Sequence, residues 1–145
     1  YDSFGWDIFS YNFSEDFANQ FKGLRIDSGD NHEQLDKIIA KYKSFGIDAR
    51  DKQVLFSNAL DTDRAIELQH YAEGKVKPSF GIGTHFTNDF PHVKPMNIVI
   101  KLVAVKITEL WPYYNDTCKI SEDEGKHTGK PEVVKRFMEA IHYKQ

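Results

Sequence analysis

A pair of alternating charged residues, followed directly by a glycine turn, is the part of this sequence best suited to chemistry. Arg25 and Asp27 alternate in the stretch Gly23–Asp30, and Ser28 and Gly29 come next. Arginine offers a fixed fork of donors to a phosphate, a carboxylate or the face of a flat ring, and aspartate accepts hydrogen bonds from sugar hydroxyls or binds a metal ion. Taken alone, the stretch fits an ordinary strand-to-helix loop with a buried Arg–Asp ion pair better than a ligand site.

Two further turns of small or polar residues follow along the chain. Ser57 and Asn58 come after the apolar stretch 54–56, and Gly81, Gly83 and Thr84 come after a third short apolar stretch. Exposed backbone N–H groups in such turns bind phosphate. For Gly81 and Gly83, close backbone packing at a barrel corner explains the glycines equally well.

The elements between these turns form a repeating pattern. Apolar residues spaced by three and four predict a helix over about 32–45, capped by Asp30 or Asn31 and ended by Gly46. A second helix is predicted over about 62–71, with Asp61 as N-cap. Strand, turn and helix thus recur at intervals of roughly 25 to 30 residues, which is typical of βα units in a parallel sheet. All three turns then lie at one edge of the sheet and form one concave site.

The pattern changes after residue 95. A β-branched stretch over 97–106 predicts a long strand, 117–121 predicts another, and the two are expected to be antiparallel. Pro131 opens a final helix with an apolar stripe of Val133, Val134, Phe137 and Ile141, which is expected to pack on the body of the fold. Before the first strand, 6–21 is aromatic-rich, with a short helix expected at either end. We therefore assign 1–95 to βα units and 96–145 to strands and a helix that complete the fold.

Composition limits the classes of function. The chain has 145 residues, of which 40% are hydrophobic and 14% aromatic, and this suits one globular α/β domain. A formal charge of -3 gives no basic field for nucleic acid. The longest apolar run, 98–105, is interrupted by Lys101 and is too short to span a membrane. Cys118 is the only cysteine, so neither an intrachain disulfide nor a thiolate zinc site can form, which fits a cytoplasmic setting.

The first residues resemble the interior of a fold. The stretch from Asp2 to Gly5 is another acidic, glycine-containing turn, and no strand precedes it in the sequence. We therefore expect the chain to be a fragment whose missing N-terminal part carries some of the site.

Four segments, in this order and spacing, resemble the C-terminal half of nicotinate phosphoribosyltransferase. They are Gly23–Asp30, Ser57–Asp61, Phe80–Thr84 and Lys101–Val103, and Lys119–Asp123 with Lys126 also resembles that family. The resemblance covers most of the chain from about Tyr1 to Thr128. Single glycine turns are common, but the ordered set is specific.

The resemblance implies a type II phosphoribosyltransferase with an incomplete, TIM-like α/β barrel. Such an enzyme joins nicotinate to the ribose 5-phosphate of phosphoribosyl pyrophosphate, releases pyrophosphate, couples ATP hydrolysis, uses Mg²⁺ and serves NAD biosynthesis. It also implies a homodimer. The resemblance assigns Asp2, Arg25 and Asp27 to the sugar, the pyridine ring and catalysis, and it assigns to substrate and phosphate binding the set Ser28, Gly29, Ser57, Asn58, Gly81, Gly83, Thr84 and His85.

Two features depart from the family pattern. Ala59 stands where the family turn usually has Asn or Asp, and the family's phosphorylated histidine has no counterpart that can be placed here. The six histidines show no metal-ligand spacing, so we assign no metal ligands in this chain and expect surface or loop positions, with His85 as the one retained contact; they are His32, His70, His85, His92, His127 and His142. The isolated chain should be inactive.

Two other functions compete with this interpretation. A related nicotinamide or quinolinate phosphoribosyltransferase would share the barrel and phosphate site, although quinolinate needs extra cationic residues that are not evident beside Arg25. A non-catalytic phosphate-binding module would keep the turns and lack turnover.

Overall fold

The computed structural model describes residues 4–94, 96, 98, 100–109, 112–121 and 125–141. Asp2, one of the predicted catalytic residues, lies outside them. The chain divides into two compact units, one of residues 12–96 and one of residues 1–11 with 97–145. Each unit is described by itself below.

The first unit contains a parallel three-stranded sheet. Its strands are β1 (Gly23–Ile26), β2 (Gln53–Phe56) and β3 (Lys77–Phe80), in the order β1-β2-β3. Leu24, Val54 and Pro78 align across the sheet, as do Ile26, Phe56 and Phe80. The predicted βα repeat and parallel sheet are therefore confirmed.

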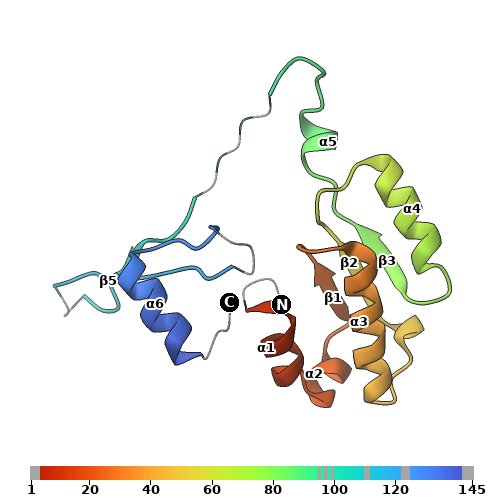
Figure 1. Ribbon diagram of the computed structural model, residues 1–145, viewed down its shortest axis with the longest axis horizontal. Helices are drawn as coiled ribbons and strands as arrows, with labels where there is room; N and C mark the ends of the chain where they lie inside the picture. Colours follow the sequence, from red (N-terminus) through yellow and green to blue (C-terminus); the bar gives the residue numbers. More distant parts are fainter. Residues whose placement is uncertain are drawn as a thin grey trace. The chain divides into compact units, whose positions relative to one another are not determined.

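Two helices connect the strands and pack on the sheet (Figure 1). They are α3 (Asn31–Ser44) and α4 (Thr62–Ala72). Asp30 caps α3 by accepting hydrogen bonds from the N–H groups of His32 and Glu33, and Asp61 caps α4 by accepting from Arg64. Gly46, at φ 72°, follows the end of α3 in the conformation that glycine favours. Both helices match their predicted ranges to within about two residues.

The core of this unit lies between the helices and one face of the sheet. The fully buried side chains come from both helices and the first two strands: Ile26, Leu35, Ile38, Tyr42, Val54, Phe56 and Leu68. Burial raises the pKa of Tyr42. The short helices α1 (Gly5–Asn12) and α2 (Glu15–Gln20) confirm the two helices expected before β1.

The other face of the sheet is largely open. Arg25 is exposed, and its neighbours in the same row, Leu55 and Ser79, are half-buried. Gln53 donates from Nε2 to Ser79 Oγ across this face at 3.2 Å. Parallel sheets in complete proteins are usually covered on both faces. The open face therefore needs a further layer.

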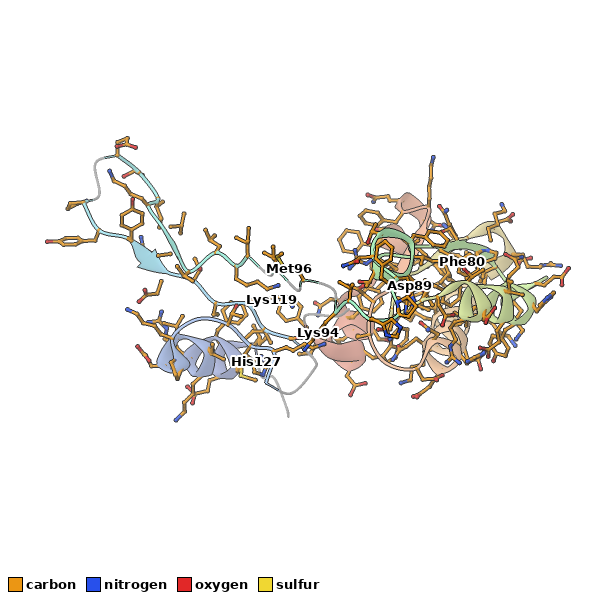
Figure 2. All side chains as sticks on the ribbon, turned by 90° about the horizontal axis from the view of Figure 1, so that it is seen from above. Phe80, Asp89, Lys94, Met96, Lys119 and His127 are labelled. Carbon is orange, nitrogen blue, oxygen red and sulfur yellow. The ribbon has the colours of Figure 1, made fainter. Side chains whose placement is uncertain are left out.

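Besides α1 and α6 (Pro131–Ala140), the described residues of the second unit have little regular structure. The predicted strand over 97–106 is wrong: only β4 (Ala104–Val105) forms, antiparallel to β5 (Asn115–Asp116), and residues 97 and 99 lie outside the described part. The predicted strand 117–121 does not form. In its place, Lys119 makes a single antiparallel bridge with Thr128, and the labels of Lys119 and His127 in Figure 2 mark this part of the chain. The full strand is absent because β-branched residues need a paired neighbour along their whole length. Among the described residues, Leu102 and Val103 are bonded only by Thr117, whose Oγ1 and N–H donate to their carbonyls at 2.8 and 3.0 Å.

The final helix forms as predicted, but its apolar stripe is not buried. Pro131 is the first residue of α6, and no residue of the helix is buried. Phe137 keeps 41% of its surface exposed, while Val133, Val134 and Ile141 are half-buried. The packing of this stripe on the body of the fold stays a prediction.

Candidate active site at the carboxyl edge of the sheet

The three turns predicted to carry the site follow the carboxyl ends of the three parallel strands. The first two are joined by side chains. Ser57 Oγ lies 2.9 Å from Asp27 Oδ1 and 3.1 Å from the Ile26 carbonyl oxygen, and Asn58 Nδ2 donates to the Gly29 carbonyl at 2.7 Å. The turns around Asp27 and Ser57 are therefore brought together, as predicted.

The ladder continues one residue past each strand. The Ser57 N–H donates to the Ile26 carbonyl and the Gly81 N–H donates to the Phe56 carbonyl, both at 2.8 Å. Asp27, Ser57 and Gly81, which we call the end row, therefore follow one another across the sheet. A Cβ on Gly81 would lie 3.3 Å from Ser57 Cβ, so a larger residue here would press on the end row.

Arg25 and Asp27 form an ion pair. Because residues two apart on a strand point to the same face, both side chains lie on the open face. The pair is not buried: the exposed fractions of the two side chains are 57% and 31%. Within this chain the pair is therefore not the buried structural ion pair of the alternative interpretation.

The first turn rests on buried polar groups. Gly29 has φ 73°, and a Cβ there would lie 2.9 Å from Gln34 Nε2. Ser28, Asn31 and Gln34 are buried, and Asn31 Oδ1 and Gln34 Oε1 find no hydrogen-bond partner among the described residues. Ser28 as a whole residue keeps only 5% of its surface exposed, so little of this predicted binding residue can meet a ligand here. Sequence analysis missed Gln34, since a glutamine on a charged helix carries no signal of burial.

The third turn adds backbone donors but no side-chain hydrogen bond or ion pair to the end row among the described residues. Gly83 precedes the four-residue helix α5 (Thr84–Thr87), and a Cβ on Gly83 would meet open space. His85 Nδ1 lies 3.4 Å from Asp89 Oδ2, and both side chains are exposed. Gly81 is therefore brought to the end row, whereas no contact joins Gly83, Thr84 or His85 to Asp27 or Ser57.

The carboxylate next to the site is held in its charged form. The pKa of Asp30 lies below its usual value, chiefly because its side chain accepts a hydrogen bond from the Glu33 N–H, with further contributions from the His32 N–H and from the charges of His32 and Arg64. Among the described residues, no three His, Cys, Asp or Glu side chains gather as a metal site.

A hollow of about 510 Å³ lies at the opposite edge of the sheet. It is lined by residues at the amino ends of the strands, including Lys22, Lys52 and Lys77. Lys52 Nζ donates there to the Ala18 and Phe21 carbonyls at 2.5 and 3.2 Å and so holds the end of α2. None of the predicted site residues lines this hollow. No helix in the part of the chain that the structure describes is long and apolar enough to cross a membrane.

Comparison with known proteins gives consistent matches. A relative from Schizosaccharomyces pombe, named probable nicotinate phosphoribosyltransferase, is 41% identical, and the match covers 92% of this chain and 34% of the relative. The nicotinate phosphoribosyltransferase of Desulforapulum autotrophicum is 40% identical over 97% of this chain and 36% of its own length. The chain thus spans about a third of these relatives.

Solved structures agree with these matches. The crystal structure of nicotinate phosphoribosyltransferase from Porphyromonas gingivalis superposes with a TM-score of 0.85 at 39% identity, covering 97% of this chain and 36% of that one. A putative nicotinate phosphoribosyltransferase from Saccharomyces cerevisiae gives a TM-score of 0.78 at 36% identity, covering 99% and 35%. The family model described as nicotinate phosphoribosyltransferase (NAPRTase) matches residues 1–143, so the chain belongs to this family.

Proposed function

We propose that this chain supplies part of the active site of an enzyme that transfers phosphoribosyl from phosphoribosyl pyrophosphate to nicotinate, with ATP hydrolysis coupled. The observation that carries the proposal is the end row, in which Asp27, Ser57 and Gly81 adjoin the exposed Arg25 on the open face of the sheet. Membership of the family supports the same reaction. Because the chain spans about a third of its relatives, the activity belongs to a larger protein.

The proposed roles follow from charge and position. Arg25 binds the nicotinate carboxylate or stacks on its ring, because a guanidinium suits both. The bond from the anomeric carbon to pyrophosphate breaks while the pyridine nitrogen forms the new bond, and positive charge builds on the sugar. Asp27, held by Ser57 on one side and Arg25 on the other, stabilises that charge.

The remaining predicted residues hold the sugar and phosphates. Ser57 and Asn58 line the ribose, and the N–H groups of Gly83 and Thr84 bind the 5-phosphate, with His85 at the rim. Asp2, outside the described residues, is kept in the proposal as an acid near the sugar. Mg²⁺ is usually bound by one or two carboxylates together with substrate phosphates, which fits Asp27 without a dedicated cluster. When bound, it would neutralise phosphate charge.

The barrel belongs to the proposal as well. A parallel sheet with one face open and three turns at its carboxyl edge fits a segment of a larger α/β barrel, whose interior would be the face that carries Arg25, Leu55 and Ser79. In this arrangement residues 1–95 supply βα units and 96–145 complete the fold. We also propose that the larger protein has an N-terminal part that is missing from this chain, that it forms a homodimer, and that it lies in the cytoplasm.

A chimera tests the reaction. Residues 1–145 replace the matching third of the Porphyromonas gingivalis protein, and formation of nicotinate mononucleotide is measured. We expect turnover, and we expect Arg25→Ala and Asp27→Ala each to reduce kcat/KM at least about tenfold, because each removes a charge that meets the ligand. Arg50→Ala is the matched control, since Arg50 and Asp48 form another exposed Arg–Asp pair two residues apart. Near-parental rates in both site variants would refute the assignment.

The same chimera separates the competing functions. Preference for nicotinamide or quinolinate over nicotinate in competition would favour a related transferase. Binding of nicotinate mononucleotide without turnover would favour the non-catalytic phosphate-binding module.

A further inference from the structure

One ion pair joins the two helices that follow the first and second turns. His32 lies in the first turn of α3 and Glu67 lies in α4, and His32 Nε2 is 3.1 Å from Glu67 Oε1. Asp30 and Asp61, which cap these helices, also end the two turns. The His32–Glu67 pair therefore links the two segments that carry Asp27 and Ser57.

The imidazole of His32 faces carboxylates on both sides. Its Nδ1 lies 3.8 Å from Asp30 Oδ1, opposite the contact to Glu67. Arg64 Nη1 lies 3.0 Å from Glu67 Oε2 and shares that carboxylate. The ring of Tyr71 packs edge-on against the imidazole, with 4.4 Å between ring centres. The imidazole thus lies between two carboxylates, and Arg64 shares the carboxylate of Glu67.

The groups around Tyr71 complete the cluster. Its hydroxyl donates to Asp36 Oδ2 at 2.9 Å, and Lys75 Nζ lies 3.5 Å from its ring centre. The hydrogen bond to Asp36 raises the pKa of Tyr71, and the backbone N–H of Glu33 lowers the pKa of Asp30. Both groups therefore keep their charge state near neutral pH. Histidine is the side chain whose charge ordinarily changes between about pH 5 and 8.

We propose that His32 and Glu67 are positioning residues of the proposed site. The protonated His32 side chain holds the N-terminal part of α3 against α4, and this fixes the first two turns relative to each other. The two hydrogen bonds between the turns, from Ser57 to Asp27 and from Asn58 to Gly29, therefore keep a single geometry. The effect on ligands rests on the proposed function, whereas the link between the helices does not.

Hydrogen exchange on the 145-residue chain tests the link without any ligand. Protection factors, corrected for the intrinsic rate, are measured at pH 6 and pH 8 for the capped amides of His32, Glu33 and Arg64. We expect protection to fall about two- to fivefold at pH 8, the range given by a partly exposed ion pair. His32→Gln and Glu67→Gln should remove the difference between the two pH values, while His32→Lys should keep the high protection at both.

His70→Gln is the matched control, because His70 lies in α4, the helix that also carries Glu67, and is exposed. It should leave the pH dependence unchanged. An equal pH dependence in the Glu67→Gln chain, or its loss in the His70→Gln chain, would overturn the inference.

The chimera supplies the second readout. We expect its KM for nicotinate to rise between pH 6 and pH 8 more steeply than that of the His32→Lys version, with kcat affected less. If the chimera shows no turnover while exchange behaves as expected, the proposed function fails and the link stands. If the exchange does not depend on pH, the inference fails whatever the chimera does.

Discussion

The backbone conformation of Ala59 bears on the Asn or Asp that was expected at this position. Ala59 has φ 50°, the one described residue other than glycine with a positive φ. Asparagine and aspartate tolerate this conformation better than alanine, because their short polar side chains bond locally. The resemblance led us to expect Asn or Asp at this turn, and either residue would suit this backbone conformation.

Replacing Ala59 should therefore stabilise the unit of residues 12–96. We expect Ala59→Gly and Ala59→Asn to raise its free energy of unfolding by about 0.5 to 1 kcal/mol, measured by urea denaturation. The same exchange inside a helix should act in the opposite direction, so Ala65→Gly in α4 should cost about 1 kcal/mol. A loss of stability in Ala59→Gly as large as that in Ala65→Gly would contradict the strained conformation.

The elements that repeat along the chain were predicted well, and the two strands expected after residue 96 were not. The apolar spacing, the Asp30 and Asp61 caps and Gly46 placed α3 and α4, and repetition placed the parallel sheet. The strand over 97–106 failed because strand formation depends on pairing, which the local sequence does not encode. The end row could be predicted, because parallel strands place their carboxyl ends at one edge of the sheet. The burial of Gln34 could not be predicted, because a glutamine on a charged helix carries no signal of burial.

Capping also sets the behaviour of one short helix in acid. Asp48 accepts hydrogen bonds from the Arg50 side chain and backbone N–H at the start of a 3-10 turn (Ala49–Asp51), and the Arg50 side chain foremost lowers the pKa of Asp48 from 3.8 to about 2. A carboxyl whose pKa is lowered by folding stabilises the fold above its unfolded pKa. That contribution is lost as the pH falls from about 4 through about 2.

Asp48→Asn should therefore flatten the fall of the melting temperature between pH 4 and pH 2. Asparagine still caps a helix, so the variant removes the charge and keeps an acceptor for the Arg50 N–H. Melting followed by circular dichroism at each pH measures this slope. An unchanged acid slope would show that the Arg50–Asp48 pair does not couple to folding.

At the scale of the whole chain, the packed unit of residues 12–96 should resist proteolysis better than the extended segment that carries Ile98, Ile100 and Leu102. Ile98, Ile100 and Leu102 are 70%, 90% and 67% exposed and lie outside any strand, and Figure 2 shows the side chains of this segment standing along the ribbon. Proteases need an extended, accessible backbone, which helices such as α3 do not offer.

Limited trypsin digestion of the 145-residue chain should therefore cut first at Lys101, which Leu102 follows. Lys37 and Lys41 lie within α3 and should be cut later, because cleavage there requires the helix to open. Mass spectrometry of the first products should give a fragment that ends at Lys101, and Lys101→Gln should delay its appearance. Early cleavage at Lys41 would show instead that α3 is not held by its buried face of Leu35, Ile38 and Tyr42.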